Sequence, residues 1–246
     1  MKNKTVIVTG AGSGIGRAVA LKFARGAANV VVADVHEAEG KRTVQQVVEQ
    51  GGNACFVMAD TSRPADCANT VQQALERFGA LHCAVNNAGI GGAGVKTADY
   101  PLERWEREIA VNLSGVFYGM RYQIAAMLEG GGGAIVNIAS VLGVTAIPLS
   151  AAYIAAKHGV VGLTKAAALE YAQQGIRVNA VGPGYTETPL LAKYDEARLA
   201  GVLARHPMGR LARPEEIANM VHWLCTDEAS YVTGAYLPAD GGYTAQ

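Results

Sequence analysis

The chain has 246 residues, of which 50% are hydrophobic, and it carries 21 lysines and arginines against 21 aspartates and glutamates. A chain of this size buries a large core without disulfides or metals, and it has room for one α/β domain or two small ones. With no net charge it lacks the field that gathers phosphate backbones or anionic lipid, so we expect neither nucleic acid nor a membrane as a partner.

The cysteines show neither zinc-site spacing nor a C-x-x-C redox pair, and they lie in apolar contexts: Cys55, Cys67, Cys83 and Cys225. We therefore expect reduced core residues in a cytoplasmic protein. The segment Met1–Thr9 lacks the length and the cleavage site of a signal peptide. The uncharged stretch 130–156 contains glycines, Pro148 and hydroxyls, so we expect a strand, a loop and a helix start there instead of a membrane span.

Short β-branched runs alternate with helix-length segments along the chain. Continuous apolar strands separated by helices predict a parallel sheet that is covered on both faces. The expected strands are Thr5–Thr9, Val30–Ala33, Ala54–Met58, His82–Asn86, Ala134–Ala139, Ile176–Val181 and Ala235–Pro238. No repeat, linker or shift in composition divides the chain, so we expect residues 1–246 to form a single doubly wound α/β domain of about seven strands.

One long segment, from about Pro183 to Arg213, has no clear periodicity. It starts at the carboxyl end of a strand, which is where open α/β sheets bind ligands. Long irregular segments in compact domains are usually lids or binding loops. We expect a substrate lid at 183–213, and a simple surface excursion is the alternative.

The first strand runs into a glycine-rich turn, Thr9-Gly10-Ala11-Gly12-Ser13-Gly14-Ile15-Gly16, which a helix follows. Glycines let the backbone approach a pyrophosphate, whose charge is stabilised by the free N–H groups of the helix start. This context predicts a Rossmann-type dinucleotide site. Its expected contacts are Gly10, Ser13, Gly14, Ile15 and Gly16.

Acidic and amide residues follow the next strands. Asp34 ends the second strand at the distance expected for a carboxylate that binds the adenosine ribose, with Val35 beside it. The alternative is a solvated turn residue or a cap of the helix that begins near Glu37. Asp60 and Thr61 follow the third strand, where the Asp60 carboxylate accepts from an adenine amino group or caps the helix after Pro64. The fourth strand ends in small and amide residues that suit a cofactor lying against backbone: Asn87, Ala88 and Gly89.

Tyr153 and Lys157 are four positions apart in a predicted helix, so they share one face. An ammonium about 4 Å from the phenol, at an effective dielectric near 20, would lower the phenol pKa by about three units, which would let Tyr153 act near neutral pH. A snorkelling lysine beside a half-buried ring is the alternative.

Taken together, these residues resemble the short-chain dehydrogenase/reductase family, of the NAD-dependent secondary alcohol dehydrogenase or ketoreductase type, over essentially the whole chain. In the matching pattern the catalytic set is Asn112, Ser140, Tyr153 and Lys157. The resemblance also makes Tyr153 and Lys157 cofactor contacts, and it assigns a nicotinamide-binding turn to Pro183, Gly184, Thr186 and Thr188. The cofactor it implies here is NAD, because Asp34 would repel the 2′-phosphate of NADP.

The resemblance implies hydride transfer between NAD(H) and a secondary alcohol or ketone, with Tyr153 as acid/base. Lys157 lowers the phenol pKa and binds the nicotinamide ribose, Ser140 stabilises the oxyanion, and Asn112 holds a proton relay. Two departures stand out: Ala156 and Gly182 occupy positions where many members carry larger polar residues. Neither removes a catalytic atom.

Three other functions fit this sequence less well. The Tyr-x-x-x-Lys spacing differs from that of enoyl reductases, which disfavours C=C reduction. An isomerase or dehydratase that keeps its nicotinamide bound, or a non-catalytic dinucleotide sensor, would need departures that the chain lacks. A sensor would be expected to have lost Tyr153 or Lys157, and an extended epimerase would carry more chain after Val181.

The five histidines are scattered without glutamate or cysteine at ligand spacing, so we expect no catalytic metal. The resemblance implies a homotetramer, with the helices around 112–128 and 151–173 at one interface and the C-terminal region at another. There Gln246 carboxylates of symmetry mates are a candidate structural Mg²⁺ site.

The expected substrate pocket is small and mostly apolar: Gly91, Gly92, Ala93, Val141, Leu142, Ile147, Tyr185, Leu190 and Leu191.

Overall fold

A computed structural model describes residues 1–192 and 194–246. Its strands form one parallel seven-stranded sheet in the order β3-β2-β1-β4-β5-β6-β7. The strands are β1 (Thr5–Thr9), β2 (Asn29–Asp34), β3 (Asn53–Met58), β4 (Cys83–Asn86), β5 (Gly133–Ile138), β6 (Ile176–Pro183) and β7 (Tyr236–Ala239). The predicted doubly wound α/β fold is confirmed, and each predicted strand is present with ends shifted by at most two residues.

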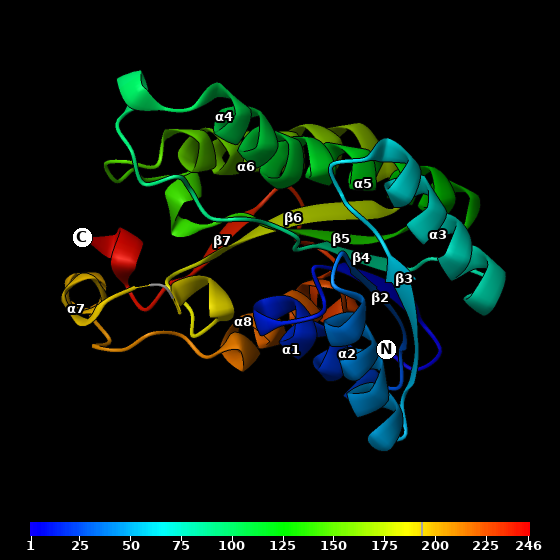
Figure 1. The fold of residues 1–246 in the computed structure, drawn as a ribbon. Coiled ribbons are helices and arrows are strands. Elements are labelled where there is room, and N and C mark those ends of the chain that lie inside the picture. The colour runs from blue at the N-terminus through cyan, green and yellow to red at the C-terminus, as the bar shows by residue number, and fades with distance from the viewer. Residues whose placement is uncertain (193) are drawn as a thin grey trace.

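Helices cover both faces of the sheet in three layers (Figure 1). The helices α3, α4, α5 and α6 lie over one face, and α1, α2 and α8 over the other, while α7 lies beside the C-terminus. Their bounds are α1 (Gly14–Arg25), α2 (Glu37–Glu49), α3 (Pro64–Phe78), α4 (Leu102–Ile109), α5 (Gly115–Glu129), α6 (Ala151–Tyr171), α7 (Glu196–Leu203) and α8 (Pro214–Leu224). None of the helices in the described part of the chain is long and apolar enough to cross a membrane.

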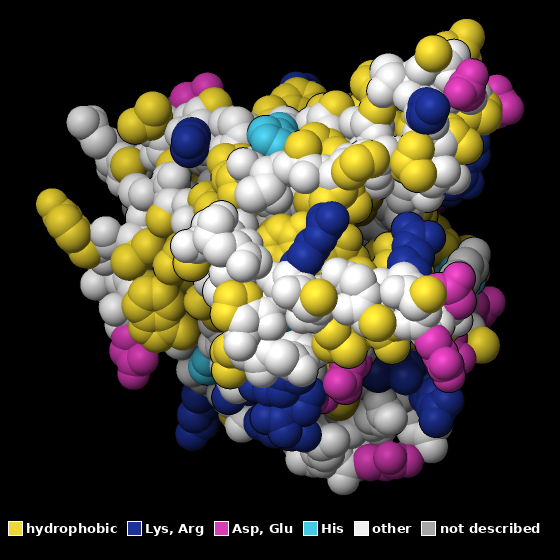
Figure 2. All heavy atoms as spheres, turned by 90° about the vertical axis from the view of Figure 1, so that its left-hand side faces the viewer, with side chains coloured by type: hydrophobic (Ala, Val, Ile, Leu, Met, Phe, Trp, Pro, Cys, Tyr) yellow, Lys and Arg dark blue, Asp and Glu magenta, His cyan; other side chains and the backbone are white. Residues whose placement is uncertain are grey.

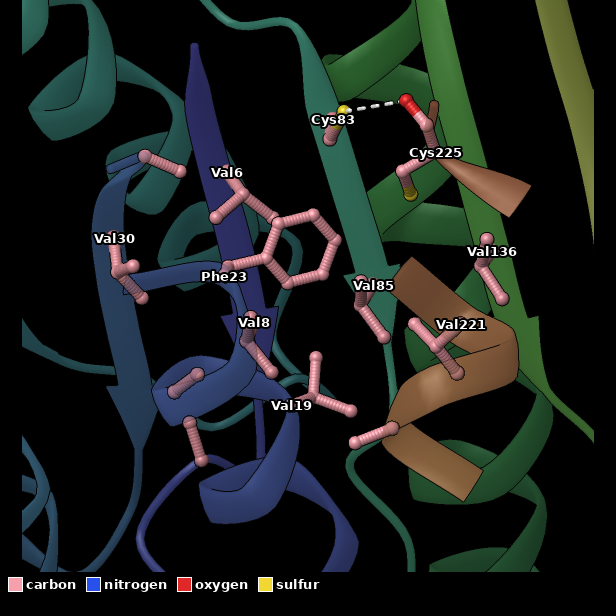
Figure 3. Close-up of a cluster of buried hydrophobic side chains, with 14 of the residues drawn as sticks. Val6, Val8, Val19, Phe23, Val30, Cys83, Val85, Val136, Val221 and Cys225 are labelled. Atoms are coloured by element: carbon pink, nitrogen blue, oxygen red, sulfur yellow. Dashed lines mark hydrogen bonds between the residues drawn. The ribbon is translucent and has the colours of Figure 1, made fainter. Parts of the chain in front are cut away.

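The central strands are buried on both faces, which explains their continuous apolar sequence. In β1, Val6 and Val8 face the core beneath α1 and α8, and Ile7 faces the opposite core. Figure 3 shows Phe23 of α1 and Val221 of α8 in the first of these cores. All four cysteines are free and buried, as expected, and the Cys83 thiol lies 3.8 Å from the Cys225 carbonyl oxygen.

The order of the strands reverses direction between β1 and β4. In open parallel sheets, ligands bind outside the carboxyl ends of the strands at such a point. Here the ends of β1, β2 and β4 carry Thr9, Asp34 and Asn86, respectively. The topology therefore brings the predicted cofactor residues to one edge of the sheet.

The segment predicted as a lid contains more regular structure than expected. Pro183 belongs to β6, and the short helix Pro189–Leu191 and α7 lie within the segment. Lys193, inside the same range, lies outside the described residues. A short bridge between Thr186 and Ala212 brings the two ends of the segment together, so it forms a closed excursion from the carboxyl edge of the sheet.

Candidate active site

The glycine-rich turn connects the end of β1 to the start of α1 and keeps its backbone open. Gly10 and Gly14 have positive φ angles of 63° and 51°, a region that favours glycine. A Cβ on Gly16 would lie 2.2 Å from the Gly10 carbonyl oxygen, so no side chain fits there. Ser13 precedes α1 without a side-chain cap, which leaves the first N–H groups of the helix without a side-chain acceptor. These features suit a bound pyrophosphate.

Asp34 ends β2 and points at this turn. Its carboxylate is 8% exposed and accepts hydrogen bonds from the backbone N–H groups of Gly12, at 2.7 Å, and His36, at 2.9 Å. The N-cap of α2 is His36, so the alternative interpretation of Asp34 as a helix cap is wrong. Each carboxylate oxygen has more than one lone pair and keeps acceptor capacity for ribose hydroxyls.

The nearby cation Arg17 is occupied by other partners. Its guanidinium forms an ion pair with Glu39 at 2.5 Å, donates to the Gly12 carbonyl oxygen and donates to the Thr43 hydroxyl at 3.1 Å. Asp34 has no ion pair with any residue that the structure describes. The negative charge at the end of β2 is therefore not neutralised by Arg17.

Residues after β4 hold the turn in place. The Asn87 side-chain amide donates to the carbonyl oxygens of Thr9, at 2.8 Å, and Gly10, at 3.2 Å. The backbone N–H groups of Asn87 and Ala88 both donate to the Thr9 hydroxyl. A Cβ on Gly10 would lie 2.9 Å from the Ala88 Cα, so small residues are needed at this contact.

Asp60 does not cap the helix that begins at Pro64. Its carboxylate accepts from the backbone N–H and hydroxyl of Ser62, and it forms an ion pair with Arg107 at 3.3 Å. The cap of α3 is Arg63, so the capping alternative is wrong. Thr61 is buried beside Gly115.

Ser140, Tyr153 and Lys157 come together where β5 ends and α6 begins. Ser140 follows β5, and its hydroxyl accepts from the Leu142 backbone N–H at 3.1 Å. Lys157 is buried, and its ammonium donates to the Ile138 carbonyl oxygen at 2.8 Å. The same nitrogen lies 5.7 Å from the centre of the Tyr153 ring, so α6 presents both side chains to one site, as predicted.

Burial governs the protonation of this group. It raises the pKa of Tyr153, opposed by a hydrogen bond from the Ser140 side chain, and it lowers the pKa of Lys157 to about 8. The expectation that the lysine charge lowers the phenol pKa by about three units is therefore wrong for this structure. Desolvation is the largest cause of the Tyr153 shift, while the Lys157 ammonium donates to the Ile138 carbonyl oxygen and lies 5.7 Å from the centre of the ring.

Asn112 lies in a π-helical segment, Ala110–Ser114, between α4 and α5. It is fully buried, and its side-chain amide accepts from the backbone N–H of Ile90, at 2.8 Å, and donates to the carbonyl oxygen of the same residue, at 2.9 Å. A Cβ on Gly89 would lie 3.0 Å from the Asn112 Oδ1 and 3.8 Å from the Lys157 ammonium. Asn112 thus fixes the loop that passes beside Lys157.

The start of the predicted lid reaches the glycine-rich turn. A Cβ on Gly14 would lie 3.0 Å from the Thr188 Cγ2, and one on Gly91 would lie 3.3 Å from a Leu190 methyl group. Thr186 is buried, and its hydroxyl donates to the Gly184 carbonyl oxygen at 3.0 Å. The predicted nicotinamide turn therefore lies between the glycine-rich turn and the predicted pocket. Gly184 itself lies against His206.

At the C-terminus, the Gln246 amide donates to the Arg205 carbonyl oxygen at 2.8 Å. Among the described residues, no group of three or more histidine, cysteine, aspartate or glutamate side chains is placed to hold a metal ion. The magnesium site at Gln246 involves symmetry mates and stays a prediction.

Sequence reasoning missed Tyr236, whose hydroxyl donates to the Ser140 carbonyl oxygen at 2.9 Å. A Cβ on Gly182 would lie 2.1 Å from that hydroxyl, so the unusual glycine makes room for the tyrosine. It also missed the buried Glu108 and His206. The unusual glycine at position 182 was the only sequence signal for this contact, and nothing in the sequence indicates that Tyr236 packs against it.

The chain is similar to known proteins over almost its whole length. A family model described as "Enoyl-(Acyl carrier protein) reductase" matches residues 10–244. Cyclohexanol dehydrogenase of Acinetobacter sp. is 49% identical over 99% of this chain and 96% of its own length. 2,5-Dichloro-2,5-cyclohexadiene-1,4-diol dehydrogenase of Sphingobium indicum is 45% identical over 100% of this chain and 98% of its own length.

Solved structures agree with these relatives. The chain superposes on levodione reductase with a TM-score of 0.97 at 35% identity, over 100% of this chain and 99% of that one. A structure from Agrobacterium tumefaciens, described as that of a putative 2-deoxy-d-gluconate 3-dehydrogenase, holds NADP; it gives a TM-score of 0.93 at 34% identity, over 100% and 98% of the two chains. The relatives from Acinetobacter and Sphingobium are, by their names, dehydrogenases of alcohols. Fold, site and relatives together show that the chain belongs to the short-chain dehydrogenase/reductase family and transfers hydride between a nicotinamide cofactor and a secondary alcohol.

Proposed function

We propose that the chain is an NAD-dependent dehydrogenase whose substrates are secondary alcohols on six-membered rings, with Ser140, Tyr153 and Lys157 as its catalytic group and Asn112 as their support. The observation that carries the choice of coenzyme is the buried carboxylate of Asp34, which faces the glycine-rich turn without a cationic partner among the described residues.

The residues present fit an NAD site. The open glycine-rich turn and the uncapped start of α1 suit a pyrophosphate, and Asp34 suits two ribose hydroxyls. A 2′-phosphate at the same place would meet an unneutralised carboxylate in a partly desolvated site. Bound NAD supplies the hydride acceptor for alcohol oxidation, and its reduced form supplies the hydride donor for the reverse reaction.

The side chains of the chain perform the proton chemistry. In alcohol oxidation the deprotonated Tyr153 oxygen takes the hydroxyl proton as the carbinol carbon loses its hydride, and in ketone reduction the protonated phenol gives that proton to the substrate oxygen. The Ser140 hydroxyl, held beside it at the end of β5, stabilises the charge that develops on the substrate oxygen. The Lys157 ammonium has three N–H donors, and one of them donates to the Ile138 carbonyl oxygen. The other two remain available to the nicotinamide ribose and to groups near Tyr153.

The substrate class rests on the relatives and on the surface near the site. Two relatives act, by their names, on alcohols of six-membered rings. On the face that carries α7 and the C-terminus, hydrophobic side chains form several groups between polar atoms and Lys or Arg side chains (Figure 2). Around the candidate site, Val144, Leu149 and Leu190 are hydrophobic side chains with a large exposed fraction. We propose that these side chains bind the carbon ring, and that the lid segment 183–213 closes over it.

The test of the coenzyme compares kcat/KM for NAD and NADP with one active alcohol. We expect NAD to be favoured by about a hundredfold or more, since each 1.4 kcal/mol of repulsion is about a factor of ten. In Asp34→Ala the ratio of kcat/KM for NAD to kcat/KM for NADP should fall, because the value for NAD decreases and the value for NADP increases. Equal values for the wild-type protein, or a preference for NADP, would show that Asp34 does not hold the ribose.

The test of the substrate class is a panel that pairs cyclohexanol with 2-hexanol and 3-hydroxybutyrate, at saturating coenzyme. We expect the highest kcat/KM for the cyclic alcohol. A higher value for either linear alcohol would refute the ring preference while leaving the reaction class in place.

Two further proposals concern the setting of the enzyme. We propose that it works in the cytoplasm, which agrees with four buried free cysteines, and that it assembles as a homotetramer through α5 and α6. The exposed hydrophobic residues Phe117 and Leu169 on these helices support the assembly.

A further inference from the structure

Glu108 is a fully buried carboxylate that the mechanism above does not use. It lies at the end of α4, next to the loop of residues 89–93, which we call the 89–93 loop. Its Oε2 accepts from the Tyr100 hydroxyl at 2.9 Å, and its Oε1 accepts from the Arg104 guanidinium at 3.4 Å. A carboxylate is costly to bury unless its oxygens are bonded, so this arrangement calls for an explanation.

The bond from Tyr100 continues into the 89–93 loop. The Tyr100 hydroxyl accepts from the backbone N–H of Ala93 at 3.2 Å and donates its own proton to Glu108. A hydroxyl that donates to a carboxylate is polarised and becomes a better acceptor. Burial, together with the bond to Glu108, raises the pKa of Tyr100, so the hydroxyl keeps the proton that it donates.

Asn112 holds the other end of the same loop. It lies four positions after Glu108 on the continuous helix formed by α4 and the π-helical segment, and its amide binds both backbone groups of Ile90. One helical face therefore fixes the loop at Ile90 directly and at Ala93 through Tyr100.

The backbone between these two points borders the reacting group. A Cβ on Gly92 would lie 3.7 Å from the Tyr153 Cβ, from the Ser150 hydroxyl and from Glu108 Oε2. One on Gly91 would lie 3.3 Å from Leu190 of the lid segment. A shift of Gly91 or Gly92 would therefore change the space between the lid and Tyr153.

We propose that Tyr100 and Glu108 form a positioning pair that fixes residues 91–93 as one wall of the alcohol pocket and thereby sets the affinity for the substrate. The role in substrate binding rests on the proposed function, whereas the fixing of the loop does not. Neither residue touches the substrate, and the pair acts through the backbone of the 89–93 loop.

The kinetic test uses Tyr100→Phe, which removes only the hydroxyl. We expect KM for the alcohol to rise by about tenfold, the effect of losing a partly buried hydrogen bond, with kcat within about threefold and NADH affinity unchanged. Glu108→Ala should show the same split, whereas Glu108→Gln, which keeps an acceptor for the tyrosine, should stay within about threefold of wild type in KM. The matched controls are Tyr231→Phe and Glu106→Gln, both at exposed positions.

Hydrogen exchange tests the loop without any turnover. In Tyr100→Phe the amide of Ala93, which loses its acceptor, should exchange at least about tenfold faster, while the amide of Ile90, held by Asn112, stays protected. If the wild-type protein oxidises no cyclic alcohol but Tyr100→Phe still exchanges faster than wild type, the proposed substrate is refuted and the positioning pair stands. Unchanged exchange and unchanged KM in a folded Tyr100→Phe protein would overturn the pair.

Discussion

At the scale of single residues, the catalytic group owes its chemistry to where its atoms are bonded. Lys157 is anchored to the Ile138 carbonyl, and Ser140 is oriented by the Leu142 N–H. Both anchors come from the end of β5 and the turn that follows it. The sheet therefore fixes the Ser140 hydroxyl and the Lys157 ammonium near Tyr153 before any substrate arrives.

Replacing Tyr153 by phenylalanine should remove the acid/base and little else. We expect kcat to fall by at least about a hundredfold with NADH affinity retained, because the ring still fills its place and only the proton-carrying oxygen is lost. Stopped-flow kinetics and NADH fluorescence titration measure the two effects. A variant that keeps most of its kcat would refute the role of Tyr153.

The buried ammonium of Lys157 should leave a signature in the pH dependence of stability. Its pKa is lowered to about 8 in the fold, so above this value the unfolded chain binds the extra proton. Stability then rises with pH between about 8 and 10.5 through this group, by up to about 3 kcal/mol. Urea unfolding of wild type and Lys157→Met across this range measures it. The difference in unfolding free energy between the two should change in favour of wild type as pH rises; a constant difference would contradict the burial cost.

At the scale of elements, the register of β6 and β7 places Tyr236 next to Gly182, and only a residue without a side chain leaves room for it there. Ala180 pairs with Tyr236 across these strands, and the Tyr236 side chain passes over Gly182 to reach the Ser140 carbonyl. The strand pair thus buttresses the turn that carries Ser140.

A methyl group on Gly182 should force these strands apart. The added Cβ would lie 2.1 Å from the Tyr236 hydroxyl and 2.3 Å from its Cζ, so Gly182→Ala should cost about 2 kcal/mol and lower Tm by about 4–8 °C. Tyr236→Val in the same chain should recover part of the loss, because the smaller side chain clears the space. Differential scanning fluorimetry of the two single variants and the double variant gives the comparison, and a double variant less stable than Gly182→Ala would show that the clash is not the cause.

The elements that could be predicted share a local signal. Strands such as Thr5–Thr9 are continuous apolar runs, and the polar residues that end them, such as Asp34, mark the carboxyl edge of the sheet. Helical spacing alone places Tyr153 and Lys157 on one face, and their catalytic role follows only from the resemblance that all the motifs carry together. These parts of the fold and site are encoded within a few neighbouring residues.

The parts that escaped prediction depend on distant partners. Tyr236 meets Ser140 across 96 positions of sequence, and only the pairing of β6 with β7 brings it there. From the sequence, Glu108 looks like an ordinary surface residue of a charged helix. Its role depends on Tyr100 and Ala93, which only the folded structure brings to it. The direction of the Tyr153 pKa shift also depends on burial, which spacing cannot supply.

At the scale of the whole molecule, a single chain does not explain why α5 and α6 expose large hydrophobic side chains. These helices cover one face of the sheet (Figure 1). Both helices carry exposed hydrophobic residues. Leu169 of α6 has 86% of its surface exposed, and Phe117 of α5 has 47%. Large exposed apolar groups on neighbouring helices are typical of protein interfaces.

Placing charges on this surface should break the proposed tetramer. Leu169→Asp and Phe117→Asp would each bury an unpaired carboxylate in a helix interface, so we expect the dissociation constant to rise by at least about a hundredfold. Val48→Asp on α2 is the matched control, because Val48 is 56% exposed and lies on the opposite layer of the fold. Sedimentation velocity should show smaller species for the two interface variants and an unchanged tetramer for the control. A wild-type protein that sediments as a monomer, or interface variants that sediment like wild type, would refute the assembly through α5 and α6.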